Sequence, residues 1–138
     1  MTRSKTTATK RWATMATVTN LAPWIAVADA DRALDYYAAA FGATALYRAA
    51  DDEGTLQVAH LTIDGADFWL QRDDDARARA GDGSIRMILT VEDPDAVFAQ
   101  AIAAGATEVA AVYEGHGWRV GRLEDPFGHH WEVGRPLG

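Results

Sequence analysis

The last residues of the chain contain a short cluster of side chains that could bind a metal ion. The stretch 125–136, DPFGHHWEVGRP, places His129, His130 and Glu132 directly after an Asp-Pro-x-Gly turn. Imidazole and carboxylate groups are ligands that zinc accepts in proteins. If a strand follows the turn, alternation points His130 and Glu132 to one face and His129 to the other. We therefore expect His130 and Glu132 to lie together and His129 to belong to the turn or the surface.

A further histidine could complete such a site. His60 lies in the run VAHLTI, where Leu61 and Ile63 alternate toward a helix layer and turn His60 to the opposite, inward face. Three donors of this kind could bind zinc if they converged. Because a buried or cross-strand histidine is commoner than a ligand, we expect no resident metal or cofactor, with a divalent ion such as zinc as the alternative. Without a metal, His60 and Glu132 could still act as catalytic acid–base groups.

The elements that must position these residues come as a repeat. The stretches 27–43 (VADADRALDYYAAAFGA) and 91–106 (VEDPDAVFAQAIAAGA) share a valine, two spaced aspartates, a helical pattern and a final Gly-Ala pair. Asp29 and Asp93 suit helix N-caps, because a short carboxylate accepts from the free N–H groups of the first turn. The glycines suit a left-handed C-terminal cap. This matching order favours an internal duplication over two coincidental helices.

The segments around both helices also match. Each helix follows one extended segment and precedes three strand-like runs separated by turn residues. A single unit of this kind has a sheet with one helix-covered face, so two units must associate to close a core. The sequence therefore predicts an α+β domain at 19–138, built from two βαβββ repeats at about 19–75 and 83–136, after a disordered basic tail at 1–18.

Composition restricts the classes of function. The chain has 138 residues, no cysteine and no apolar run near the ~20 residues that a membrane helix needs. The missing cysteines exclude disulfides and thiolate chemistry and fit a reducing cytoplasm, where we place the protein. Four of the 13 basic residues lie in the first eleven positions, so the remainder is strongly acidic. An acidic body disfavours nucleic acids and would attract a cationic small molecule.

The repeat and the closing hairpin together resemble the vicinal oxygen chelate superfamily, which includes glyoxalase I, bleomycin-resistance proteins and extradiol dioxygenases. The resemblance rests on the two strand-to-helix stretches and on GWRVGRLEDPFGHHWEVGRPL, and it covers about residues 19–137. It implies the glyoxalase/bleomycin-resistance fold, an open, curled barrel of mixed β-sheet with helices outside and a ligand cavity inside. It also implies a homodimer.

Metal-dependent members of that superfamily take one ligand from the first strand and one from the last strand of each half. The residues that match these positions here are Ala22, Trp69 (Gln71 if the register is shifted by two), Arg86 and Glu132. Only Glu132 is a usual ligand, and an arginine has no acceptor atom. We hypothesise that the Arg86 guanidinium occupies the place of the cation and pairs with Glu132, the alternative being a plain surface ion pair.

The same resemblance indicates which residues face the cavity. Five tryptophans are many for a small chain, and aromatic walls with a few polar groups suit a flat or amphipathic ligand. Trp131 is out of phase with Glu132 and is expected in the core. The expected cavity residues are Trp24, His60, Trp69, Gln71, Arg86 and Glu132, with Trp118, Arg119 and His130 as further candidates. The alternative for Trp24 and Trp69 is that they fill the core.

Two classes of function remain open. The first is a non-catalytic protein that binds a small organic ligand, cationic or aromatic, as the bleomycin-resistance branch does. The second is an enzyme of the same superfamily, a metal-dependent or acid–base lyase, isomerase or dioxygenase. The incomplete ligand set favours the binding protein, and the chain has no nucleophile motif, phosphate-binding glycine loop or dinucleotide fingerprint.

Overall fold

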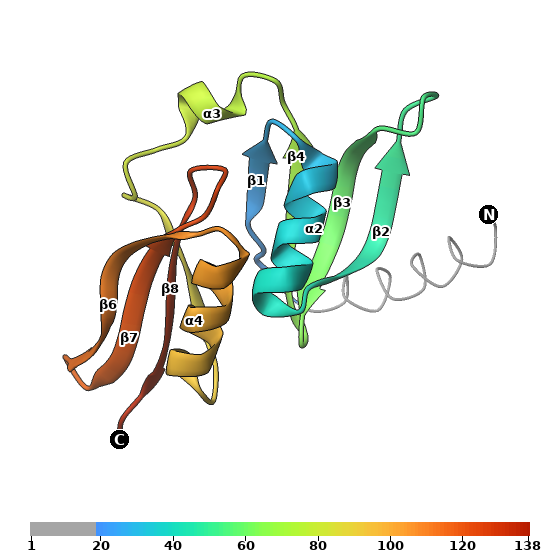
Figure 1. Cartoon of the computed structure of the whole chain (residues 1–138). Coiled ribbons are helices and arrows are strands. Elements are labelled where there is room, and N and C mark those ends of the chain that lie inside the picture. Colours follow the sequence, from blue (N-terminus) through green and yellow to red (C-terminus); the bar gives the residue numbers. More distant parts are fainter. Residues whose placement is uncertain (1–18) are drawn as a thin grey trace.

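The computed structural model describes residues 19–138, and the tail predicted at 1–18 lies outside the described residues. The order strand–helix–strand–strand–strand occurs twice, which confirms the α+β class and the two modules (Figure 1). The first module contains β1 (Trp24–Val27), α2 (Ala30–Phe41), β2 (Thr44–Ala50), β3 (Leu56–Ile63) and β4 (Ala66–Arg72). The second contains β5 (Arg86–Thr90), α4 (Pro94–Ala104), β6 (Thr107–Gly115), β7 (Trp118–Glu124) and β8 (His130–Pro136).

The two helices begin and end at the predicted residues. Oδ1 of Asp29 accepts a hydrogen bond from a backbone N–H of the first turn of α2 at 3.0 Å, and Oδ1 of Asp93 does the same for α4 at 3.2 Å. At the end of α2, Gly42 has a φ of 72°, a left-handed conformation that glycine adopts without steric cost. Local sequence signals therefore set the limits of both helices.

Each module forms its own four-stranded mixed sheet. The strand orders are β1-β4-β3-β2 in the first sheet and β5-β8-β7-β6 in the second, so the duplicated sequence gives the same topology twice. The first and last strands of each module pair in parallel, and the other pairs are antiparallel. Within residues 19–138 the edge strands β1 and β5 are not hydrogen-bonded to each other, so the two sheets meet without closing a barrel.

The core lies between the helices and the sheets. Helix α2 packs on the first sheet and α4 on the second, and the two helices contact each other in front of both sheets (Figure 1). Aromatic rings from both modules meet there: Phe41 and Trp131 have centroids 4.6 Å apart, and Phe68 lies 5.6 Å from Trp131. Trp131 is 2% exposed, which confirms its predicted place in the core.

A buried carboxylate fixes the turn before β8. Oδ2 of Asp125 accepts from the Tyr37 hydroxyl at 2.6 Å and from the Trp131 indole N–H at 3.0 Å. Oδ1 accepts from the backbone N–H groups of Phe127 and His129 at 2.9 and 3.0 Å. Burial raises the pKa of Tyr37, and the neighbouring Asp125 carboxylate raises it further. The Asp-Pro-x-Gly turn is thereby held in one conformation against α2.

The connection between the modules contains a short helix that the sequence did not predict. Helix α3 (Ala76–Arg79) lies beyond the end of β1 in Figure 1 and begins after Asp73, whose backbone N–H donates to the Val27 carbonyl at 2.9 Å. Its Arg77 reaches Glu124 on β7 at 3.4 Å, so the connection touches both sheets. Four residues are too few to show the apolar periodicity of a helix, so the sequence gives no signal for α3. No helix within residues 19–138 is long and apolar enough to cross a membrane.

Candidate functional site

A row of aromatic side chains crosses the face of the first sheet that is opposite to α2. The strand register places Trp24 beside Trp69, Trp69 beside His60 and His60 beside Tyr47, one residue from each strand. The His60 and Trp69 rings are almost parallel, 2° apart at a centroid distance of 4.2 Å, and Trp24 stacks on Trp69 at 5.8 Å. Trp24, at the β1 end of the row, is 54% exposed. An exposed indole backed by stacked rings is a ready surface for a flat apolar group.

Polar partners orient two members of this row. The Trp24 indole N–H donates to Oε1 of Gln71 at 3.0 Å, which fixes the indole against β4. His60 is 5% exposed and its Nε2 lies 3.2 Å from Oδ2 of Asp67. The structure therefore brings Trp24, His60, Trp69 and Gln71 together on one face of the first sheet, whereas Arg86 and Glu132 lie on the second sheet.

The face of the second sheet that is opposite to α4 carries the expected arginine–glutamate pair. Arg86 Nη1 donates to Glu132 Oε2, and the Arg86 Nε–H also donates to the Gly83 carbonyl at 3.2 Å. The side chains of Arg86 and Glu132 are 41% and 22% exposed. The pair forms, and water still reaches both charges.

Arg122 is a neighbour of this pair that sequence reasoning missed. Its Nε and Nη2 lie 3.3 and 3.1 Å from Nδ1 of His130, and Nη2 also donates to the Gly83 carbonyl at 3.3 Å. Because a guanidinium can only donate, Nδ1 of His130 accepts and the hydrogen of the neutral ring lies on Nε2, 3.8 Å from a Glu124 oxygen. Trp118 and Arg122 are four positions apart on one strand and therefore share a face. Alternation from Trp118 could thus have indicated Arg122 in place of Arg119.

Arg119 and Trp118 lie away from this cluster. Arg119 donates to both oxygens of Asp95 on α4, at 2.8 and 2.9 Å, and to Glu114 at 3.3 Å, so it belongs to the helix-covered side. The hydrogen bond from Arg119 lowers the pKa of Asp95. Trp118 pairs with Pro136 at the end of β7 opposite to the residues beside His130. Neighbours on one strand point to opposite faces, so Trp118 and Arg119 cannot line one wall together.

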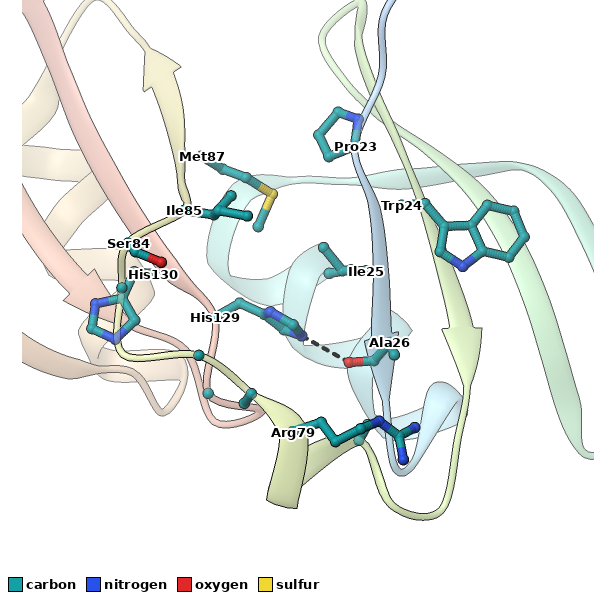
Figure 2. Close-up of a pocket in the computed structure, with 15 residues that line it drawn as sticks. Pro23, Trp24, Ile25, Ala26, Arg79, Ser84, Ile85, Met87, His129 and His130 are labelled. Atoms are coloured by element: carbon teal, nitrogen blue, oxygen red, sulfur yellow. Dashed lines mark hydrogen bonds between the residues drawn. The ribbon is translucent and has the colours of Figure 1, made fainter.

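A cavity of about 530 Å³ lies between the two modules, and we call it the seam pocket. Figure 2 shows β1 on one side, the chain leading into β5 on the other, and α3 closing one end. Most of its lining is apolar, with Pro23, Ile25, Ile85 and Met87 from the two edge strands and their approaches. Trp24 is among the residues that line it, but its indole points to the other side of β1, toward the aromatic row (Figure 2).

His129 spans the seam pocket. Its Nε2 lies 2.8 Å from the backbone carbonyl oxygen of Ala26 on β1, and Figure 2 shows this bond across the middle of the view. The backbone of His129 is held in turn by Asp125. The residue is partly buried and links the modules. The sequence predicted His129 in the turn or on the surface. It could not indicate the contact with β1, because alternation along β8 gives no information about the neighbouring module.

A second cavity, of about 450 Å³, lies along the same seam toward the start of β1. It is lined by Ala22, by Ile85 and the β5 residues 86–89, and by Asp67 and Phe68 of β4. Two of the four positions implied by the superfamily, Ala22 and Arg86, meet at this cavity.

Comparisons with known proteins give the same classification as the geometry. The sequence model of the glyoxalase-like domain family matches residues 23–134, so the chain belongs to that family. The chain is 40% identical over 129 residues to the uncharacterized protein Rv0887c of Mycobacterium tuberculosis, with 85% of this chain and 74% of the relative covered.

Solved structures share the fold. The crystal structure of TioX from Micromonospora sp. ML1 matches with a TM-score of 0.68 and 29% identity over 85% of this chain and 95% of TioX. TnmS3, an antibiotic binding protein from Streptomyces sp. CB03234, matches with a TM-score of 0.62 and 22% identity over 86% and 98% of the two chains. At that identity the likeness to TnmS3 shows the fold alone.

The residues at the metal positions of the superfamily do not fit a divalent ion. Ala22 and Trp69 carry no acceptor that binds such an ion, and the guanidinium of Arg86 is itself a cation beside Glu132. Within residues 19–138, no group of three His, Asp or Glu side chains could hold an ion. What these positions offer instead is a fixed ion pair.

Proposed function

We propose that the protein binds a small organic molecule in the seam pocket and on the adjoining aromatic row, without a metal ion. The observation that carries the proposal is the pocket itself, about 530 Å³ of mostly apolar surface between the modules with the exposed Trp24 at its border. Ligand pockets commonly have volumes of roughly 300–1,000 Å³ and combine apolar walls with a few polar groups.

Two further features support a binding role. The stacked rings of Trp24, Trp69 and His60 offer a rigid apolar surface. Because the rings are already ordered, a ligand that binds there does not bear the entropic cost of ordering them. The name of one protein with the same fold, TnmS3, describes it as an antibiotic binding protein. We infer that the ligand is a flat or amphipathic organic compound that leaves chemically unchanged.

A matched pair of tryptophan variants tests the proposal. Quenching of tryptophan fluorescence by a panel of naphthalene derivatives would identify a binding probe, and calorimetry would give its affinity. We expect Trp24→Ala to lower the affinity for the probe by roughly tenfold or more, because the truncation removes an aromatic surface on which the probe can stack. Trp118→Ala is the control, since Trp118 lines neither cavity. Equal affinities of the two variants would refute the aromatic row as part of the site.

An acid–base or metal-dependent enzyme is the second candidate. The observation that favours it is the imidazole–carboxylate pair of His60 and Asp67, since a carboxylate beside a histidine can orient it for proton transfer. Metal analysis of the purified protein before and after EDTA, together with analysis of the probe for products, separates the candidates. Stoichiometric metal or a chemically altered probe would support the enzyme.

The homodimer is also part of the proposal. It follows from the resemblance to the superfamily and from the strongly exposed Leu21 and Ile85 beside the seam, 96% and 87% exposed. Sedimentation of the purified full chain would measure its mass in solution, and a monomer at all concentrations would contradict the dimer.

A further inference from the structure

The ionisable side chains that line the seam pocket are all potential cations. They are Arg79 from α3 and His129 and His130 from the start of β8, and none of the described residues lining the pocket carries a carboxylate. The whole chain has a net charge of −7, so this composition differs sharply from its average surface. The pocket offers donors to a negative group and no charge that would attract a positive one.

The hydrogen bond of His129 determines what its ring presents to a ligand. The Ala26 carbonyl can only accept, so Nε2 must carry a hydrogen. The other nitrogen, Nδ1, has no hydrogen-bond partner within residues 19–138. In a protonated ring Nδ1 is a second donor, so an acidic group can accept a hydrogen bond from it. An acidic group in the pocket and a protonated His129 would therefore stabilise each other.

Arg79 supplies a permanent charge at the α3 end of the pocket (Figure 2). Its guanidinium pairs with Asp73 through Nη2, and the side chain is 60% exposed, so other N–H groups remain open to solvent. Figure 2 shows Arg79 and His129 on either side of the Ala26 carbonyl. Arg79 can bind a carboxylate through its remaining donors while it keeps Asp73.

The nearby carboxylates already have cationic neighbours. Asp73 pairs with Arg79, and Glu124 lies 3.4 Å from Arg77 and 3.8 Å from Nε2 of His130. Arg122 also donates to Gly83, whose backbone lines the pocket. Charges elsewhere on the acidic surface are screened over about 8 Å at physiological ionic strength, so the local donors decide which charge is preferred.

The opposite end of the pocket is apolar. Pro23, Ile25, Ile85 and Met87 gather there from the two sides of the seam, away from Arg79 (Figure 2). A ligand that matches both ends has an apolar or aromatic body and an acidic group.

We propose that the ligand of the seam pocket is an organic acid, with an apolar body between the edge strands and a carboxylate or similar anion held by His129 and Arg79. This inference rests on the proposed function. It replaces the cationic ligand suggested by net charge with one chosen by the groups that line the pocket.

Three probes with one ring system and different charges test the inference. They are naphthalene-1-acetate, its neutral amide and 2-(1-naphthyl)ethylamine, titrated into the full chain at neutral pH and followed by amide NMR shifts and calorimetry. We expect the acetate to bind roughly tenfold more tightly than the amide and the amine to bind most weakly. An amine that binds as tightly as the acetate would overturn the inference.

Variants locate the preference. His129→Gln retains a donor for the Ala26 carbonyl and removes the Nδ1 donor of a protonated ring. Arg79→Gln removes the permanent charge. Arg48→Gln, on the exposed surface of β2, is the control. The ratio of the binding affinity for the acetate to that for the amide should fall several-fold in each single variant. It should approach one in the double variant and stay unchanged in the control. A ratio that persists in the folded double variant would refute the roles of both residues.

The outcomes separate this inference from the proposed function. If all three probes bind equally and Trp24→Ala weakens them, the seam pocket is a ligand site with no preference for acids, and only the inference fails. If no probe shifts the amide resonances of residues 24–26 or 83–87, the proposed site and the inference both fail.

Discussion

Tyr37 on α2 donates its hydroxyl hydrogen to Oδ2 of Asp125 over 2.6 Å, and this bond joins two residues that lie 88 positions apart in the chain. Both side chains are buried, Tyr37 at 0% and Asp125 at 2% exposure. A buried carboxylate is tolerated only when its oxygens are hydrogen-bonded, and here the first module supplies one donor and the second module three. The turn that carries His129 to the seam pocket is therefore fixed by a residue of the other module.

Removing the Tyr37 hydroxyl should destabilise the whole fold. A hydrogen bond to a charged group contributes about 1.5–3 kcal/mol, so Tyr37→Phe should lower the free energy of unfolding by that amount. Urea unfolding monitored by circular dichroism gives the value. Tyr47→Phe, on the 37% exposed Tyr47, is the control and should change the free energy by less than about 0.5 kcal/mol. A loss no larger for Tyr37 than for Tyr47 would show that the bond contributes little.

Stability should also decline in strong alkali. Burial raises the pKa of both Tyr36 and Tyr37, and the Asp125 carboxylate adds to each increase. A group whose pKa is higher in the folded state stabilises the fold fully below its unfolded pKa. That contribution is then lost as the pH rises toward the folded value. The free energy of unfolding should therefore fall above about pH 10, the ordinary tyrosine pKa.

Urea midpoints at a series of alkaline pH values measure this decline. Lysine occurs only at positions 5 and 10. Within residues 19–138 the tyrosines are therefore the side chains whose ordinary pKa lies in this alkaline pH range. Tyr37→Phe should make the decline shallower, because one of the two shifted groups is gone. An unchanged slope in the variant would contradict the assignment.

Features fixed by a few neighbouring residues could be predicted from the sequence. The N-caps Asp29 and Asp93 and the glycine after α2 set the helices where expected, because each acts within one turn. Alternation placed Trp131 in the core and Glu132 on the opposite face. The pairing of Arg86 with Glu132 followed from the resemblance, because the superfamily brings these two strand positions together.

Features that depend on how the modules sit against each other could not be predicted. The seam pocket and the bond from His129 to Ala26 exist only because β1 and β5 approach edge to edge. Arg119 was expected near the cavity but pairs with Asp95, because its position on β7 is the one that faces α4. Charge balance of the whole chain suggested a cationic ligand, but composition does not show which charges surround one pocket.

The pair of Arg86 and Glu132 should contribute only modestly to stability. The two side chains are 41% and 22% exposed, and exposed ion pairs typically contribute about 0.2–1 kcal/mol. A double-mutant cycle with Arg86→Met and Glu132→Gln should give a coupling energy in that range. The coupling should shrink at about 1 M salt, where charges are screened over a few ångströms. A coupling well above that range that resists salt would instead indicate a pair enclosed by the protein.

Two glycines with similar backbones should respond differently to an added methyl group. Gly128 and Gly54 have φ values of 94° and 86°, a region in which a side chain costs about 1–2 kcal/mol. A Cβ on Gly54 would meet no atom within 4 Å, whereas one on Gly128 would lie 2.7 Å from the Ala80 Cβ and 2.5 Å from an Arg77 nitrogen. Gly54→Ala should show the backbone cost alone. Gly128→Ala should exceed it by about 1 kcal/mol or more, because α3 must shift away from the turn. Equal losses of stability in the two variants, measured by urea unfolding, would mean that α3 does not rest on the turn at Gly128.

The same variant should also affect binding, since α3 carries Arg79. Gly128→Ala should weaken the binding of naphthalene-1-acetate relative to the binding of its amide.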